Sequence, residues 1–145
     1  CCGVSTLEAM ALNLGVHKGF VLPVMDARRN QVYTATFYAE NGNLIRKTED
    51  RAISLNELKE ELKKLSESVF LVGDGSILCY NTLKEEVPRL VCPGEHRMHQ
   101  RAAGVGIAAA RMIAAGDPCD ADLLSPNYLR LSQAERERLE RQNQL

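Results

Sequence analysis

An Asn-Gly pair at positions 41 and 42 constrains the fold of this chain more than any other local feature. It separates two segments that are rich in strand-forming residues, 32–39 and 44–49. Asn-Gly readily adopts the positive φ angles of a tight turn. The two segments are therefore predicted to be neighbouring antiparallel strands.

A third apolar run, residues 20–25, precedes this hairpin and is joined to it through the short polar segment 28–30. Three strands with short connections predict an antiparallel meander. Residues 69–72 and 90–92 read as two further strands, each in a stretch where strand and helix alternate. Such strands usually pair in parallel, because the helix carries the chain back across the sheet.

The predicted fold class is therefore α/β: a mixed β-sheet, with a three-strand antiparallel meander plus parallel strands, flanked by helices. This is the layout of a ribonuclease H-like or actin-like (ASKHA) half. Five helices are predicted from apolar spacing, capping signals and charge, at residues 5–16, 54–66, 77–87, 98–115 and 132–141.

Three segments are expected along the chain. Residues 1–17 would form a helix linking from a missing N-terminal half, and residues 18–117 would form the actin-like domain. Residues 118–145 would be an extended tail, wrapping the domain, and a charged C-terminal helix.

Composition narrows the function classes. The chain has 145 residues, 45% of them hydrophobic, a net charge of −1 and a pI near 6.4, which argues against a module that binds nucleic acid by itself. No apolar stretch is long enough to span a bilayer. The five cysteines show no C-x-x-C spacing, so we expect reduced thiols in a cytoplasmic protein.

The strongest candidate for a ligand contact is Gly73, Asp74, Gly75 and Ser76, a degenerate nucleotide-loop position between a strand and a helix. Open α/β sheets place ligand loops there. The structural alternative is favoured over ligand contact. Glycine can simply provide the turn, and Asp74 or Ser76 can cap the helix.

Asp26, Arg28 and Arg29 form a second candidate site at the first hairpin, where they could contact an anion or a partner protein. The alternative is an aspartate that caps the turn beside two solvated arginines. Bulky side chains here do not favour a phosphate cradle.

Other patterns are weaker. Residues 104–109 match the spacing of a dinucleotide loop, but they lie within a helical pattern and are interpreted as a small-residue packing face. His96 and His99 lack a third ligand, so no metal site is predicted. No serine or cysteine has an activating partner, so no catalytic residue and no cofactor are predicted.

Several segments resemble the TsaB (YeaZ-type) family, and they follow the family's order over most of the chain. They are residues 3–9, 23–29, 32–33, 73–75 and 126–130, with 132–136 resembling the family's terminus. The resemblance implies two actin-like halves, of which this chain matches the second. It also implies work with the proteins TsaD and TsaE, and with the threonylcarbamoyl-AMP synthase, in forming N6-threonylcarbamoyladenosine beside the tRNA anticodon.

By this resemblance the chain would be a non-catalytic scaffold, an inactive paralogue of the TsaD transferase. TsaD would be contacted mainly through helices of the first half, a homodimer is an alternative assembly, and tRNA would be met only within the complex. Two enzymatic alternatives stay open: a glycoprotease-type metallopeptidase and an ATP-binding or phosphotransferase module.

Overall fold

The computed structural model describes residues 1–15, 18–92, 94–117, 120–130 and 141–142. The charged helix predicted for residues 132–141 lies outside the described residues, apart from its last position, as does Cys119. Among the helices in the described parts of the chain, none has the length and apolar character needed to cross a bilayer.

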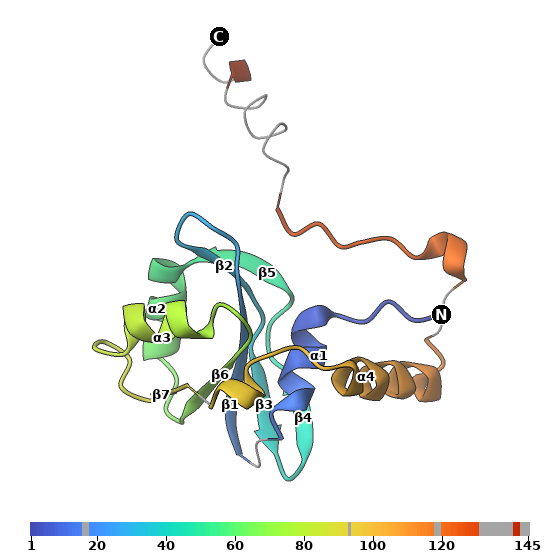
Figure 1. The fold of residues 1–145 in the computed structure, drawn as a ribbon, viewed down its shortest axis with the longest axis horizontal. Coiled ribbons are helices and arrows are strands. Elements are labelled where there is room, and N and C mark those ends of the chain that lie inside the picture. Colours follow the sequence, from blue (N-terminus) through green and yellow to red (C-terminus); the bar gives the residue numbers. More distant parts are fainter. Residues whose placement is uncertain (16–17, 93, 118–119, 131–140, 143–145) are drawn as a thin grey trace.

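A seven-stranded sheet forms the centre of the molecule (Figure 1). Its central strand, β1 (Lys18–Asp26), pairs antiparallel with β2 (Gln31–Thr34) and β3 (Phe37–Glu40). Beyond these, β4 (Asn43–Arg46) pairs with β3 and β5 (Arg51–Ser54) with β2. On its other side β1 pairs in parallel with β6 (Val69–Val72), which pairs in parallel with β7 (Leu90–Val91).

The predicted second strand, residues 32–39, is divided into β2 and β3 at the level of Pro23. Val24 pairs with Thr34 and Val21 with Phe37, so the register against β1 is the same on both sides of the break. A proline has no N–H to donate to a strand ladder. The Pro23 carbonyl instead accepts a hydrogen bond of 2.7 Å from Thr34 Oγ1.

The predicted third strand, residues 44–49, was wrong at its C-terminal end. β4 ends at Arg46, and the chain rejoins the sheet as β5, which the sequence did not indicate. At the bend between them, the N–H groups of Lys47 and Thr48 both donate to the Thr36 carbonyl. These contacts hold the edge of the sheet at the break between β2 and β3.

Within the described ranges, four α-helices surround the sheet: α1 (Thr6–Asn13), α2 (Leu55–Lys63), α3 (Ser76–Leu83) and α4 (Ala102–Ala115). The capping box predicted for α2 is confirmed, because Ser54 Oγ accepts from Glu57 N and the Glu57 carboxylate accepts from Ser54 N. α1 and α2 each end three residues earlier than predicted, and the larger differences are at α3 and α4. α3 stops at Leu83 rather than at residue 87, and the extended Arg101 separates α4 from a 3-10 turn, η1 (Glu95–Arg97). A second 3-10 turn, η2 (Ala121–Leu123), lies in the tail.

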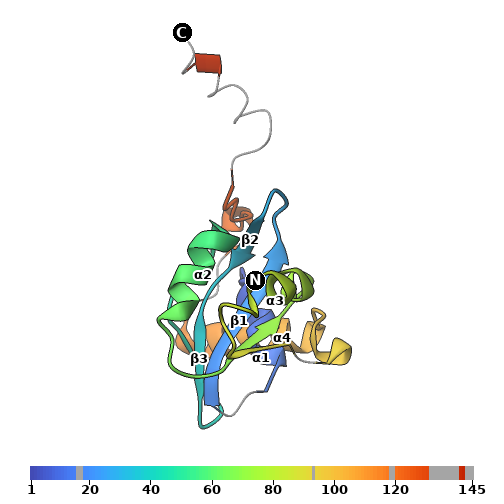
Figure 2. The same cartoon turned by 90° about the vertical axis from the view of Figure 1, so that its left-hand side faces the viewer.

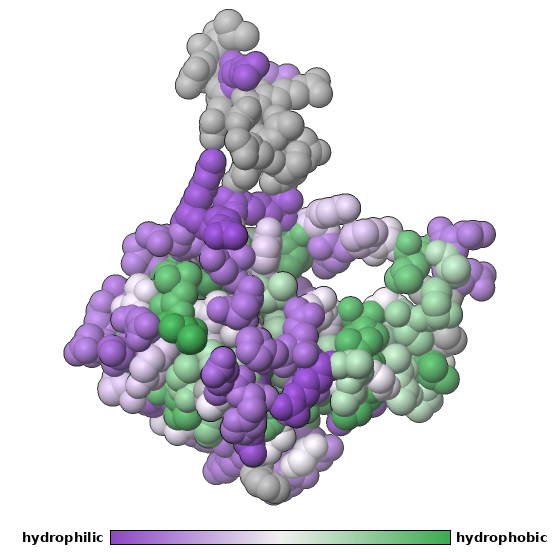
Figure 3. Space-filling view, viewed as in Figure 1, coloured by the Kyte–Doolittle hydropathy of each residue, from purple (hydrophilic) through white to green (hydrophobic). Residues whose placement is uncertain are grey.

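Alternate residues of β1 face two separate cores, as expected for a strand covered on both faces. Leu22 and Val24 pack with α2 and α3 on one face. Val21 packs with α1 and Phe37 on the other, so α1 is an integral part of the core. Figures 1 and 2 show these layers, with α4 lying on α1. α4 exposes the apolar side chains Val105, Ile107 and Ile113. Figure 3 shows hydrophobic surface at the right, where Figure 1 places α4.

Candidate functional site

The glycine loop joins β6 to α3 and packs directly against the end of β1. Gly73 has a φ of +109°, and a Cβ there would lie 2.3 Å from the Val24 carbonyl oxygen. A Cβ at Gly75 would lie 2.9 Å from Val24 Cγ1 and 3.1 Å from the Asp26 nitrogen. Both positions therefore need glycine because two backbones approach closely.

Three N–H groups of this loop already donate to protein carbonyls. Gly73 N donates to Met98 O at 2.8 Å, Gly75 N to Val24 O at 3.0 Å and Ser76 N to Gly73 O at 3.1 Å. A phosphate cradle needs such groups to point at the anion. The observed bonds thus favour a packing role, and ligand binding by residues 73–76 stays a prediction.

The capping alternative for this loop is not what the structure shows. Gly75 is the N-cap residue of α3, and no side chain caps that helix. Ser76 is fully buried, and its Oγ has no hydrogen-bond partner. A buried hydroxyl without a partner is costly, and nothing in the described residues explains it.

At the tip of the first hairpin, Asp26 performs the turn-capping role. Its Oδ1 accepts a 2.7 Å hydrogen bond from the backbone N–H of Arg28. Arg28, Arg29 and Asn30 follow with φ angles of 65°, 56° and 57°, and all three are exposed. The two predicted sites are thus neighbours, because Gly75 packs beside the Asp26 backbone.

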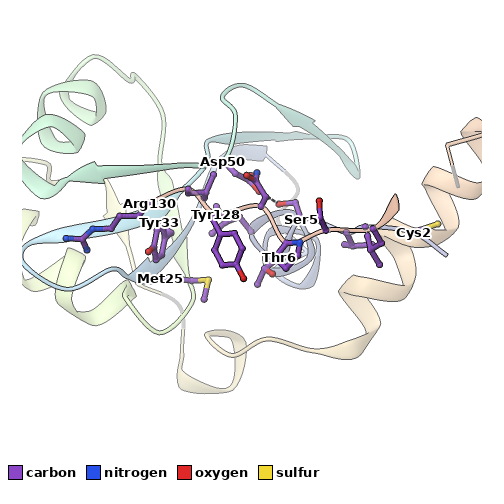
Figure 4. A pocket seen from close by; sticks show the side chains of 16 residues that line it. Cys2, Ser5, Thr6, Met25, Tyr33, Asp50, Tyr128 and Arg130 are labelled. Carbon is purple, nitrogen blue, oxygen red and sulfur yellow. Dashed lines mark hydrogen bonds between the residues drawn. The ribbon is translucent and has the colours of Figure 1, made fainter. Parts of the chain in front are cut away.

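A groove of about 870 Å³ was not anticipated from the sequence (Figure 4). Its walls are residues 2–7 at the start of the chain, Met25, Tyr33, Asp50 and the tail residues 124–130. Three distant segments meet there, and the tail carries no periodic pattern that could have predicted its course. Figure 1 shows the described residues 120–130 running from beyond the end of α4 back toward the turn between β1 and β2.

Two contacts hold the tail across this groove. The Arg130 guanidinium donates a hydrogen bond to the Ala27 carbonyl oxygen. At the other end, a Cβ on Gly3 would lie 2.8 Å from Leu124 Cδ1, so the tail packs closely on the N-terminal segment.

A charged network reaches the groove at Ser5 and Asp50 and ties α1 to the bend between β4 and β5. Asp50 accepts from Ser5 Oγ at 2.5 Å and from Arg46 Nη1 at 2.6 Å. Arg46 Nη2 also donates to Glu8 Oε2 at 2.8 Å, and its guanidinium lies 4.7 Å from the Phe37 ring centroid. Burial lowers the pKa of Arg46, but hydrogen bonds from its guanidinium to Asp50 and Glu8 outweigh burial and raise it. Because both Asp50 oxygens are engaged, this carboxylate is poorly placed to act as a base.

The histidine pair and residues 104–109 do not add to either predicted site. His96 and His99 are exposed, and the described ranges contain no group of three or more His, Cys, Asp or Glu arranged to hold a metal. Residues 104–109 lie inside α4, as the packing interpretation required. A Cβ at Gly104 would lie 2.1 Å from the Ala9 carbonyl, which identifies α1 as the neighbour.

Comparison with known proteins agrees with the segments quoted from the sequence. No family model matches the chain. The tRNA threonylcarbamoyladenosine biosynthesis protein TsaB of Bacillus subtilis (strain 168) is 31% identical over 140 residues, which are 96% of this chain and 59% of that protein. The chain is related to the TsaB and YeaZ proteins.

Solved structures agree in fold. A crystal structure of an uncharacterized protein with similarity to peptidase YEAZ from Pseudomonas aeruginosa superposes with a TM-score of 0.61 at 18% identity. That match covers 88% of this chain and 57% of the other. YeaZ from Pseudomonas aeruginosa gives 0.57 at 17% identity, covering 86% and 58%. The chain thus spans less than two thirds of each of these proteins.

Proposed function

We propose that this chain is a non-catalytic partner subunit of the machinery that forms N6-threonylcarbamoyladenosine in tRNA. The observation that carries the proposal is the 31% identity to Bacillus subtilis TsaB, which extends over 96% of the chain. That relationship supports involvement in the biosynthesis of this nucleoside. The proposal adds that the chain is a scaffold and that it works with partner proteins.

The proposal includes an actin-like (ASKHA) assignment for the domain. Its support is the order of the sheet: three hairpin-linked strands, interrupted at Pro23, followed by β6 and β7 in parallel. The similarity to the two Pseudomonas aeruginosa structures concerns the fold alone, so it supports the sheet and not the activity.

The hydrogen bonds of the candidate residues support the absence of catalysis. Three N–H groups of the glycine loop donate hydrogen bonds to the carbonyls of Met98, Val24 and Gly73. Asp26 caps its own turn, and Asp50 is held by Ser5 and Arg46. The loop N–H groups of Gly73, Gly75 and Ser76, one oxygen of Asp26 and both oxygens of Asp50 are therefore engaged in holding the fold.

The proposed partners are TsaD and TsaE, with TsaD as the subunit that performs the transfer. Contact with TsaD would be made mainly by the first half of a family member, so this chain would bind TsaD weakly. A homodimer is the alternative assembly. A role in tRNA modification would place the protein in the cytoplasm.

Assays of the purified chain for ATP hydrolysis and for protein cleavage test its non-catalytic role. We expect no turnover above a buffer control in either assay, because no constellation for either reaction was found in the sequence. Asp26→Asn and Asp74→Asn are the matched variants. Robust turnover that either substitution abolishes would overturn the proposal in favour of an enzyme.

A further inference from the structure

Three arginines gather at the turn between β1 and β2, which projects from the molecule in Figures 1 and 2. Arg28 and Arg29 are exposed on the turn itself. Arg130 reaches the same turn from the tail, 103 positions beyond Ala27, by donating to the Ala27 carbonyl. Folding therefore assembles a basic cluster, defined here as Arg28, Arg29 and Arg130.

The positive charge of this basic cluster is not neutralised by the described part of the chain. The described ion pairs join Arg46, Arg51, Lys59 and Lys63 to carboxylates, and no member of the cluster takes part in them. Arg130 is bonded to a neutral carbonyl, and the nearby Asp26 uses Oδ1 for the Arg28 N–H. Among the described residues, no carboxylate competes with an external anion for these guanidinium groups.

The backbone of the turn is fixed in an unusual conformation. Three successive residues without glycine, 28–30, have positive φ angles, which costs about 1 kcal/mol for each L residue. Hydrogen bonds hold this arrangement: Gln31 N donates to Arg28 O at 3.1 Å, and Leu55 N donates to Asn30 O at 3.0 Å. Glycine would fit such angles more easily, so arginine here favours a functional explanation over a structural one.

The chemistry of the turn favours a phosphate backbone over a protein surface. Protein interfaces use arginine as an anchor together with buried aromatic side chains, whereas the turn formed by Arg28, Arg29, Asn30 and Gln31 offers arginine without any aromatic or aliphatic side chain. Arginine pairs with phosphate through two parallel N–H bonds. Contacts of this kind position RNA without reading its sequence.

We propose that the basic cluster binds the phosphate backbone of RNA, and that tRNA is its ligand. The identity of the ligand as tRNA rests on the proposed function, whereas the phosphate chemistry rests on the cluster itself. With a net charge of −1, the whole chain supplies little general attraction, so the contact is weak and adds to those of other subunits.

The test is fluorescence anisotropy of end-labelled unmodified tRNA, titrated with the full chain at low and at moderate salt. We expect binding that weakens as salt rises, because phosphate contacts release counterions. Arg28→Gln/Arg29→Gln should reduce affinity about tenfold at low salt and lower the salt slope by about two. Arg28→Lys/Arg29→Lys should retain most of the binding.

Two further variants separate binding from folding. Arg111→Gln removes an exposed arginine on α4 that has no ion pair among the described contacts, and it should leave the affinity unchanged. Arg28→Gly/Arg29→Gly should lose binding while the melting temperature stays the same or rises, because glycine relieves the positive φ angles.

Absence of salt-dependent tRNA binding by the parent chain would overturn the proposal. Equal affinity of the parent and the double Gln variant would also overturn it. If the double Gln variant kept its tRNA affinity and lost affinity for TsaD, the cluster would be a protein contact instead. TsaD binding is measured separately, so loss of the RNA proposal leaves the proposed partner role standing, and the converse also holds.

Discussion

Gly104 and Gly106 lie two residues apart on α4 and have opposite surroundings. A Cβ at Gly104 would lie 2.1 Å from the Ala9 carbonyl, whereas a Cβ at Gly106 would meet nothing within 4 Å. The sequence shows both as members of one small-residue face. The structure assigns the close approach to Gly104 alone, because only that position faces α1.

Alanine substitutions should therefore act in opposite directions at these two positions. Gly104→Ala should lower the free energy of unfolding by about 2 kcal/mol, because α4 must move away from α1. Gly106→Ala should raise it by up to about 1 kcal/mol, because alanine favours the helix. Chemical denaturation of both variants checks this. Equal effects of the two substitutions would contradict the helix contact.

The thiol of Cys79 should be the least reactive cysteine in the described part of the folded chain. Burial, together with the neighbouring Cys92, raises the pKa of Cys79 to about 12. At pH 8 only about one molecule in ten thousand would carry its thiolate, the reactive form. Alkylation followed by mass spectrometry should label the exposed Cys1 first and Cys79 only after unfolding. Labelling of Cys79 at the rate of Cys1 would show that α3 does not hold this side chain in the core.

At the scale of elements, a carboxylate beyond the end of α3 joins that helix to α2. Glu86 accepts hydrogen bonds from Lys59 Nζ at 2.8 Å and from Lys63 Nζ at 2.7 Å. These bonds lower the pKa of Glu86 to about 2, below its ordinary value of 4.5. A lowered pKa stabilises the folded state above pH 4.5, and this contribution is lost as pH falls from about 4.5 to about 2.

The variant Glu86→Gln should therefore lose less stability than the parent chain when the pH falls from 5 to 2. Thermal melting across this pH range measures the difference. Glu85→Gln is the matched control, because Glu85 is exposed and forms no ion pair among the described contacts. A parallel decline of the parent and Glu86→Gln would show that the bridge to α2 is absent in solution.

The network around Arg46 should matter more than an ordinary surface ion pair. Its side chain is 26% exposed and Asp50 is 17% exposed, so solvent screens the pair incompletely. Arg46→Ala should lower the free energy of unfolding by about 2 kcal/mol, since Asp50 and Glu8 lose charged donors. Arg111→Ala, at an exposed helical site, should change it by less than about 0.5 kcal/mol. Similar values for the two variants would place Arg46 in solvent.

Features that depend on residues close in the sequence were predicted well. Features that depend on contacts between distant segments could not be predicted. The Asn41-Gly42 turn and the Ser54 capping box depend on neighbouring residues, so both could be read from the sequence. The division of β2 from β3 depends on Pro23, which lies on the adjacent strand. α4 begins only after Arg101, whose backbone is extended, although the helical pattern of the sequence begins at residue 98.

The candidate sites, too, could be predicted only where their residues lie close together in the sequence. Asp26, Arg28 and Arg29 were identified from the hairpin sequence, but the part played by Arg130 depends on the course of the tail. The groove beneath residues 124–130 joins three segments with no shared pattern, so sequence reasoning had no means of finding it. The glycine loop was found for its position at the end of a strand, but the use of its N–H groups required the fold.

For the whole molecule, the fold and the proposed assembly are separate questions. Two cores, one on each face of the sheet, include α1, α2 and α3, so the described residues supply their own packing. Stable subunit contacts bury about 1,200 to 2,000 Å² and rely on a few anchor residues. If the first half of a family member provides those anchors, this chain keeps its fold and loses most of its affinity for TsaD.

Isothermal titration calorimetry of this chain against TsaD tests the partner role most directly, with a complete TsaB as the reference. Circular dichroism first establishes that the chain is folded. The account predicts saturable binding that is much weaker than that of complete TsaB. No saturable binding by the folded chain would contradict its role as a TsaD partner, and an affinity equal to that of complete TsaB would contradict placing the main interface in the other half.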